Sequence, residues 1–274
     1  MLAWTYLSAG ENELMELADE YYADGDYFTA ISEAMRYQWF YPTGRLYPRS
    51  LVLIGKSYYR GNNYQAALNV LFSCYHDFPR SVESEEALYL VGFIKLMKGS
   101  PPDAIKTLDI YRMTYRSGIF IEEVYRDACY GSALAFDIPG SMKEIKKYRE
   151  RYPQGKYCAD MDKLESMLAD ETTRPRHHLW LSVLGSVFIP GYAHFYMGKY
   201  AIGIITLFTN AFFSFMIYNG YRMNNVFQMI FFSVAEAIVY QYNIFSSIRL
   251  VDEYNIKRNE DFFKRVRLGI TVAF

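Results

Sequence analysis

A small set of polar side chains lies within the apolar last third of this sequence, and their types and spacing could support chemistry. Residues 179–248 carry three formally charged side chains, which are Lys199, Arg222 and Glu236. An ionisable group inside an apolar helix can relay a proton, line an ion path or anchor a packing hydrogen bond. The candidate partners of Glu236 are His194, Asn210 and Lys199. Because a relay or an ion path needs a chain of such groups, we favour a protonated or hydrogen-bonded Glu236 that fixes helix packing.

Two apolar segments each carry a polar stripe at helical spacing. In the later segment the polar residues are separated by three or four positions, so they fall within about 80° of one helical face; they are Ser233, Glu236, Tyr240, Asn243 and Ser247. The earlier segment has a comparable stripe of Gly203, Thr206, Asn210 and Ser214. Polar stripes facing lipid would be costly, so we expect them to face each other or residues 179–197. The sequence therefore predicts an intramembrane polar network of His194, Asn210, Glu236, Tyr240 and Asn243.

The elements that must position this network are three apolar segments, at 179–197, 201–221 and 223–248. A bilayer core of about 30 Å needs about 20 helical residues, so the last two segments are long enough to span it. Tyr and Trp residues near the segment ends are typical of membrane interfaces. A buried helix pair of a soluble protein is the alternative interpretation.

The first segment is interrupted at Pro190-Gly191. Pro190 removes a backbone donor and Gly191 permits a tight reversal. With Gly198 and Lys199, these residues predict a membrane turn, in which a short half-span or re-entrant helix emerges at the surface before 201–221 enters again. His194 would present a polar tip at this interface, and a binding role for it is the alternative.

The stretch IPGYAHFYMGKYAIGI, residues 189–204, resembles a two-transmembrane-helix domain with a G-x-x-G-x-[HQ]-x-F-Y-x-G-[RK] turn. The matching residues are Gly191, His194, Phe195, Tyr196, Gly198 and Lys199. The sequence departs from the family at Tyr192, where many relatives have a small residue, and at Phe195, which shifts the usual order. The resemblance covers about 180–256 and implies a helical membrane domain that bacteria fuse to tetratricopeptide repeats.

The first half of the chain repeats with a period of 37 residues. Residues 21–42 align with 58–79 without a gap, and small residues recur at the same interval, as Ala30, Ala67 and Ala104 and as Ala18, Gly55 and Gly92. This pattern predicts pairs of antiparallel helices. Gly55 and Ala67 would let the helices of a pair approach closely, Tyr58 and Tyr64 would fill the space between pairs, and Gly25 or Asn62 would supply a positive φ in the turn.

These repeats resemble the tetratricopeptide repeat over residues 13–155, with a weaker fourth copy from about Tyr125 to Pro153. Their Y-x-x-A-[IL] helices that end in an aromatic-Pro pair are similar to those of bacterial envelope proteins, such as the tetratricopeptide lipoprotein of the outer-membrane barrel assembly machinery. Such solenoids bind peptides or protein faces, so the resemblance implies protein partners.

Composition excludes several classes of function. The net charge of −1 gives no overall electrostatic field that would attract nucleic acid. The three cysteines, Cys74, Cys129 and Cys158, form no CxxC pair. Two of them lie in helical patterns, so we expect buried thiols. No protease, hydrolase, P-loop or dinucleotide motif is present. We therefore expect a protein that is not an enzyme and needs no metal or cofactor. The N-terminus has no pattern typical of a cleavable signal, although a start codon further upstream would change this.

The sequence thus predicts an all-α protein with a helical solenoid followed by a membrane domain of two to three apolar helices. The expected divisions are 1–12 as an N-terminal segment, 13–168 as a solenoid of about four helix pairs, 169–178 as a linker, 179–248 as the membrane domain and 249–274 as a basic juxtamembrane tail. Alternating Leu268, Ile270, Val272 and Phe274 suggest a short strand in this tail or a frayed end.

The expected function is a membrane-anchored scaffold of the bacterial cell envelope that binds proteins through its solenoid. The alternative is a small transporter or intramembrane enzyme that uses Glu236 and His194 under regulation by the solenoid. Basic residues flank the apolar region on both sides, so the positive-inside rule favours an inner-membrane protein with a cytoplasmic solenoid. A signal sequence upstream would make the solenoid periplasmic instead.

Overall fold

The computed structural model describes residues 10–79 and 81–270, and these residues are helical with no strand among them. The helices are α2 (Glu11–Ala23), α3 (Tyr27–Phe40), α4 (Tyr47–Arg60), α5 (Tyr64–Asp77), α6 (Val82–Lys98), α7 (Pro101–Thr114), α8 (Ile121–Leu134), α9 (Ile138–Arg151), α10 (Cys158–Thr173), α11 (Leu179–Phe188), α12 (Tyr192–Tyr196), α13 (Tyr200–Arg222) and α14 (Val226–Gly269). They form two compact units, residues 1–169 with 265–274 and residues 170–264.

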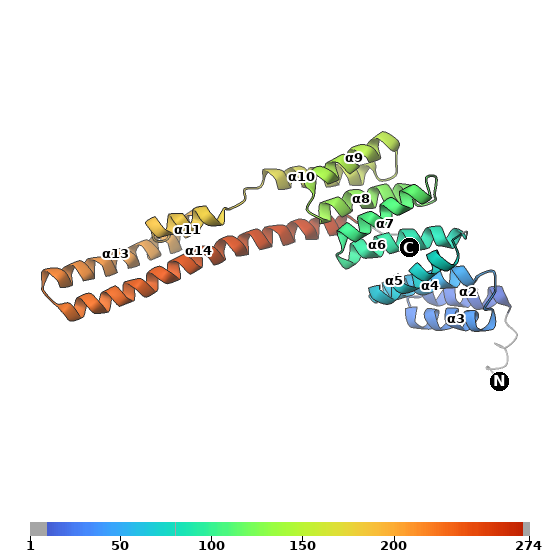
Figure 1. The fold of residues 1–274 in the computed structure, drawn as a ribbon, viewed down its shortest axis with the longest axis horizontal. Coiled ribbons are helices and arrows are strands. Elements are labelled where there is room, and N and C mark those ends of the chain that lie inside the picture. The colour runs from blue at the N-terminus through green and yellow to red at the C-terminus, as the bar shows by residue number, and fades with distance from the viewer. Residues whose placement is uncertain (1–9, 80, 271–274) are drawn as a thin grey trace. The chain divides into compact units, whose positions relative to one another are not determined.

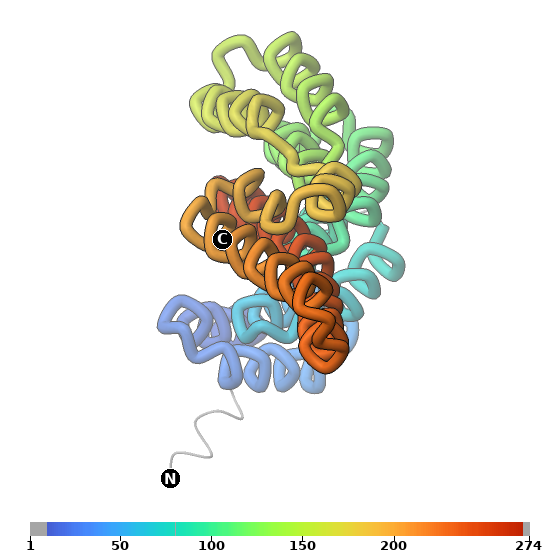
Figure 2. Tube along the Cα trace, turned by 90° about the vertical axis from the view of Figure 1, so that its left-hand side faces the viewer, coloured from blue at the N-terminus to red at the C-terminus, as the bar shows by residue number. Residues whose placement is uncertain are grey.

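The first unit is the expected solenoid of helix pairs. Helices α2/α3, α4/α5, α6/α7 and α8/α9 follow one another as antiparallel pairs (Figures 1 and 2). The fourth pair is as complete as the others, although its sequence match is weaker. Helix α10 begins at Cys158, 37 residues after the start of α8, so it stands in the register of a first helix of a fifth copy.

The turn within each pair has the same backbone in all four copies. Positive φ angles occur at Gly25, Asn62, Gly99 and Phe136, which are each 37 residues apart. The sequence predicts this conformation at the first two positions. The residue that follows is the N-cap of the second helix, and Asp26, Asn63 and Asp137 each accept a backbone N–H three residues later. The repeat period is therefore set by a left-handed residue followed by a cap.

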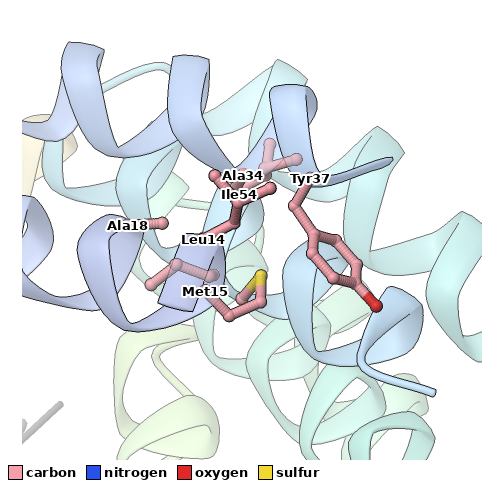
Figure 3. Close-up of a cluster of buried hydrophobic side chains, with 7 residues drawn as sticks. Leu14, Met15, Ala18, Ala34, Tyr37 and Ile54 are labelled. Carbon is pink, nitrogen blue, oxygen red and sulfur yellow. The ribbon is translucent and has the colours of Figure 1, made fainter. Parts of the chain in front are cut away.

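Small residues bring the two helices of a pair together. A Cβ atom on Gly55 would lie 2.5 Å from Cγ of Leu71, and one on Gly92 would lie 2.7 Å from Cδ2 of Leu108. Ala30, Ala67 and Ala104 are fully buried in the second helices. Tyr58 is partly buried against a core cluster that includes Leu14, Met15, Ala34, Tyr37 and Ile54 (Figure 3). The ring of Tyr64 is tilted against that of Tyr59, with 5.8 Å between the ring centres.

We expect Gly55→Ala to lower the free energy of unfolding by about 1–3 kcal/mol, because the added methyl group overlaps the fully buried Leu71. Urea denaturation of the full chain in mild detergent, followed by circular dichroism, measures this change. The control is Gly61→Ala, where the nearest atom to the new Cβ is a carbonyl oxygen at 3.4 Å. A loss at Gly61 as large as that at Gly55 would contradict the packing argument.

A second repeated feature, which we call a tie, is a tyrosine on the second helix of a pair that bonds to a glutamate on the first helix and to the backbone that follows the pair. The Tyr111 hydroxyl donates to Oε1 of Glu85 at 2.5 Å and accepts the Phe120 N–H, while Glu85 also accepts the Ile119 N–H. Tyr37 with Glu11 and Tyr148 with Glu122 repeat this arrangement, at spacings of 37 residues or multiples of it. In the second copy Cys74 and Pro48 take these positions, and the thiol donates to the Pro48 carbonyl.

Glycine is needed beside each tie. A Cβ on Gly118 would lie 2.4 Å from Glu85 Oε1 and 2.5 Å from the Tyr111 hydroxyl, and Gly44 and Gly155 hold the same place in their copies. Burial raises the pKa of the Tyr111 hydroxyl, and the bond to Glu85 raises it further. The bond from Tyr37 lowers the pKa of Glu11. The tie between Tyr37 and Glu11 therefore joins a neutral phenol to an ionised carboxylate.

We expect Tyr111→Phe to lower the free energy of unfolding by about 1–3 kcal/mol, because Glu85 loses its phenol donor and the Phe120 N–H loses an acceptor. Tyr21→Phe is the control, since Tyr21 stands outside the tie positions. Equal stability of both variants in urea denaturation would show that the tie contributes nothing.

The C-terminal end differs from the expected strand. Helix α14 continues to Gly269, so the strand prediction is wrong for residues 264–269, while residues 271–274 lie outside the described residues. The reason is the burial period: Val266 and Ile270, four residues apart, are buried, whereas Leu268 is 74% exposed. Helix α14 also has no break at residue 249, and helix α10 extends to Thr173 within the expected linker.

Candidate functional site

The second unit is organised around the Pro190-Gly191 break. Helix α11 ends at Phe188, α12 is a single short helix, and α13 begins at Tyr200. Gly191 has a φ of +90° and Gly198 has a φ of +72°. A Cβ on Gly191 would lie 2.5 Å from the carbonyl oxygen of Gly203, so the start of α12 approaches the backbone of α13 closely. Only glycine fits position 191 because both the conformation and the space exclude a side chain.

Asn243 on α14 completes the hydrogen bonds that this break leaves open. Pro190 has no N–H, so the Ser186 carbonyl has no helical donor four residues later. The side-chain amide of Asn243 donates to this carbonyl at 3.1 Å, and its Oδ1 accepts the Gly191 N–H at 3.0 Å. The Tyr240 hydroxyl donates to the Val187 carbonyl. One buried amide, 2% exposed, therefore takes the place of two missing helical bonds.

His194 lies beside this cluster and is 7% exposed. Its Nε2 is 3.4 Å from the Ser246 hydroxyl. The hydroxyl of Ser186 accepts the Ala193 N–H at 3.1 Å, which fixes α12 against α11. Lys199 is exposed and is the N-cap residue of α13.

A pocket of about 340 Å³ lies between α11, α13 and α14, one turn away from the cluster. Its apolar walls are Val187, Phe188, Pro190, Leu207 and Ala211, and its polar residues are Asn210, Ser214, Glu236 and Tyr240. Asn210 is 4% exposed and donates through Nδ2 to the Thr206 carbonyl at 2.7 Å. Asn210 Oδ1 and Glu236 Oε2 are buried oxygen atoms without a hydrogen-bond partner.

The structure thus divides the predicted network into two groups. Asn243 and His194 lie at the break, whereas Asn210 and Glu236 lie in the pocket. Tyr240 belongs to both, since it bonds to Val187 and lines the pocket. His194 is not among the pocket residues, so the structure does not bring together the pair that a transporter or enzyme would use.

Sequence reasoning missed Ser182 and Ser186, which are fully buried on α11. Their spacing of four residues in an apolar helix was the available signal. It also missed the Glu-Tyr-Gly ties of the solenoid, although these residues recur at the period that the sequence shows. The signal was a glutamate followed 26 residues later by a tyrosine and 33 residues later by a glycine.

The second unit has an unusual distribution of side chains. Between residues 179 and 248 many large apolar residues are exposed, including Phe188 and Phe208 at 81% and 69%, and also Ile205, Phe212, Phe215, Phe227, Ile230 and Phe231. Its polar residues Asn210, Asn243, Ser182, Ser186 and Ser247 are buried. This is the reverse of the arrangement in a water-soluble core.

One helix among the described residues, Tyr200–Arg222, is both long and apolar enough to cross a membrane. Only 11% of its apolar window is buried, whereas the core helix of a soluble protein is mostly buried. The sequence also predicts a membrane span in the first half of α14, but the mean hydropathy of this helix falls below the level that α13 reaches. The reason lies in Gln228, Glu236, Gln241 and Asn243, which lower the mean hydropathy of its first half.

The solenoid carries a second group of residues with notable electrostatics, on α8. Arg126 and Asp127 form a buried ion pair at 2.7 Å, and the Tyr89 hydroxyl donates to Asp127 at 3.3 Å. The Arg126 guanidinium also lies 4.4 Å from the centre of the Tyr157 ring. Burial raises the pKa of Asp127 to about 6, although the Arg126 charge opposes this change.

The cysteines are placed as the sequence predicts. Cys74 and Cys129 are buried, and Cys158 is partly exposed. Burial raises the pKa of the Cys74 thiol to about 12 and raises that of Cys129 as well. Within the described ranges no group of three or more His, Cys, Asp and Glu side chains is placed to hold a metal ion.

Comparison with protein families gives a match to YfiO, described as an outer membrane lipoprotein, over residues 8–172. The match covers more than half of the chain. The chain belongs to the YfiO family. This agrees with the resemblance to tetratricopeptide envelope proteins that the repeats show, and the region matched ends before the apolar helices begin. The YfiO-like solenoid is of a kind that acts as a protein-interaction scaffold.

Other comparisons add less. A tetratricopeptide repeat protein from Parabacteroides merdae, known from a crystal structure, is 14% identical, with a TM-score of 0.47, covering 94% of this chain and 98% of that one. No curated protein matches the chain at a significant level.

Proposed function

We propose that this protein is a membrane-anchored scaffold of the bacterial cell envelope, which binds proteins through its YfiO-like solenoid. The single observation that carries the anchoring is the reversed exposure of residues 179–248, with large apolar side chains outside and Asn and Ser side chains inside. Exposed apolar surface of this extent is rare on soluble monomers. Contact with lipid explains the exposed apolar side chains. It also explains the buried polar side chains, because hydrogen bonds between helices hold them together where no water competes.

Helices α13 and α14 form the proposed anchor as an antiparallel hairpin joined at residues 223–225 (Figure 1). Helix α13 has 23 residues, or about 35 Å, which exceeds a hydrocarbon core of about 30 Å. In this proposal the first half of α14 makes the second crossing, because Phe227, Ile230 and Phe231 expose an apolar face there, although this half is less apolar than α13. Two crossings return the chain to the side from which it entered. Arg174 and Arg176 before the hairpin and Arg249, Lys257 and Arg258 after it then lie on one side, which the positive-inside rule places in the cytoplasm of an inner-membrane protein.

The test of the anchor is extraction of cell membranes with alkaline carbonate. The full chain should stay in the membrane pellet, and Phe208→Lys should shift a measurable part of it to the soluble fraction, because a lysine in mid-span costs about 2.5–3.5 kcal/mol. Phe28→Lys is the control, since Phe28 is also a largely exposed phenylalanine but lies on the solenoid, at 81% against 69% for Phe208. Complete release of the unmodified chain by carbonate would end the proposal.

The side of the membrane can be tested with the natural thiols. Cys158 is partly exposed, whereas Cys74 and Cys129 are buried. A membrane-impermeant maleimide should leave Cys158 unlabelled in intact cells and label it after lysis. Labelling in intact cells would instead indicate a solenoid in the periplasm, as expected for an outer membrane lipoprotein such as the family's name describes.

Exposed aromatic residues on the second helices of the repeats are the proposed contacts for protein partners. Trp39 on α3 is 83% exposed and Phe72 on α5 is 58% exposed. Aromatic side chains dominate the energetics of many interfaces. A photo-crosslinker at position 39 should capture a defined partner that one at Gln65, an exposed polar position, does not capture.

A transporter or intramembrane enzyme is the second candidate. It would need Glu236 and His194 to act together, and the Glu236 pocket does not include His194. The structure therefore offers no specific support for this function.

A further inference from the structure

We propose that the pocket around Glu236 binds the primary ammonium group of an amphipathic amine. The inference adds a ligand site to the proposed scaffold, and it rests on that function only in placing the pocket within lipid. The observation that carries it is that Asn210 and Glu236 line one pocket with apolar walls, and that Oδ1 of Asn210 and Oε2 of Glu236 are both buried without a hydrogen-bond partner.

Apart from the Ser214 hydroxyl, which can also accept a hydrogen bond, the polar side chains of the pocket present acceptors. The amide of Asn210 is already committed to the Thr206 carbonyl, which also fixes the direction of its Oδ1. The hydroxyl of Tyr240 is committed to the Val187 carbonyl. A ligand for this pocket must therefore bring donors, and a primary ammonium group has three.

Charge points to a cation rather than to a neutral donor. Glu236 forms no ion pair among the described residues, and the other charged side chains of residues 179–248, Lys199 and Arg222, stand at the two ends of α13. An unpaired carboxylate in an apolar setting is costly, and a bound cation offsets this cost. An ammonium group also donates a hydrogen bond to Asn210 Oδ1. A metal ion fits less well, because Asn210 and Glu236 would offer it two oxygen ligands, fewer than Mg²⁺ or Ca²⁺ takes.

Depth decides the source of the amine. Asn210 is ten residues from Tyr200 and twelve from Arg222, or about 15–18 Å along α13 from either end. Glu236 is ten residues from the start of α14, at a similar depth. The amine headgroup of a phospholipid stays at the interface, so it does not reach this level. The ligand is therefore a free amine with an apolar body, for which Val187, Phe188 and Leu207 form the walls.

The experiment measures the binding of n-octylamine to the full chain in phosphatidylcholine nanodiscs by isothermal titration calorimetry, with empty nanodiscs subtracted. Octyltrimethylammonium keeps the charge without N–H donors, and octanol keeps a donor without the charge. We expect saturable binding of one octylamine, with affinities at least tenfold weaker for the other two. Adding phosphatidylethanolamine to the nanodiscs should not compete, since its amine does not reach the pocket. Competition by this lipid, or equal binding of all three probes, would overturn the assignment.

Variants locate the site. Glu236→Gln should weaken octylamine binding at least tenfold and Asn210→Leu severalfold, whereas Ser233→Ala, one turn from Glu236 on α14 and outside the pocket, should leave it unchanged. If Glu236→Gln does not fold, Ser214→Cys provides a second measurement, because octylamine should protect its thiol from maleimide. Unchanged binding in Glu236→Gln or unprotected thiol labelling would refute the site.

Carbonate extraction of the same variants separates this inference from the proposed function. A chain that stays in the membrane but does not bind octylamine refutes the pocket alone. A chain released by carbonate refutes the anchor, and with it the premise of the pocket.

Discussion

Replacing Asp127 by Ala should lower the free energy of unfolding of the solenoid by about 3–5 kcal/mol, because it leaves the buried Arg126 guanidinium without its counter-charge. The loss is measured by urea denaturation of the full chain in mild detergent, with hydrogen exchange in α8 to assign it to this unit. An apolar pair, Arg126→Met with Asp127→Leu, removes both charges and should recover most of the loss. If the double variant is as unstable as Asp127→Ala, the ion pair itself is not the cause.

The same pair predicts a pH dependence with a defined sign. The folded pKa of Asp127, about 6, is above its ordinary value of 3.8, so the folded state binds this proton more tightly than the unfolded state. Its stabilising contribution is complete below about pH 4 and is lost as pH rises through about 6. Relative to the apolar double variant, the unmodified chain should therefore lose stability as the pH rises from 4 to 7. A constant difference between the two proteins over this range would contradict the raised pKa.

The second large effect is expected at the helix break. Asn243→Leu should destabilise the C-terminal unit by about 2–5 kcal/mol, because the Gly191 N–H and the Ser186 carbonyl lose their partner together and both are buried. Unfolding of the full chain by a graded series of SDS in mixed micelles measures this change. Asn219→Leu is the matched control, since this half-buried amide on α13 makes a weak contact with the Met223 sulfur at 3.8 Å.

A stability of Asn243→Leu equal to that of Asn219→Leu would show that the break does not depend on the side chain of α14. A lowered stability with unchanged octylamine binding would separate the structural cluster from the proposed ligand pocket. The two sites share Tyr240, so Tyr240→Phe should affect the break without removing the acceptors of the pocket.

The sequence by itself determined the solenoid. Its 37-residue period carries the left-handed turn residues Gly25 and Asn62, the caps Asp26 and Asn63, and the small residues Gly55 and Gly92, and each acts locally or within one helix pair. Local rules suffice here, because a repeat contacts its neighbours in the same way in every copy. The Pro190-Gly191 break was equally visible, since proline and glycine act on the backbone at their own positions.

Only the tertiary structure decided how the polar residues are shared between two groups. Helical spacing put Asn243 and Glu236 on one face of α14, and it did not distinguish an amide that completes a broken helix from a carboxylate that faces a pocket. That distinction depends on which part of α11 lies opposite each residue, more than 40 positions away in the chain. The alternation of apolar residues at the C-terminal end suggested a strand for a related reason. The buried residues there, Val266 and Ile270, are four positions apart, which is the spacing of the helix α14. When a side chain contacts a distant segment of the chain, its role depends on the residues that lie opposite it. The spacing of residues within its own helix does not specify those partners.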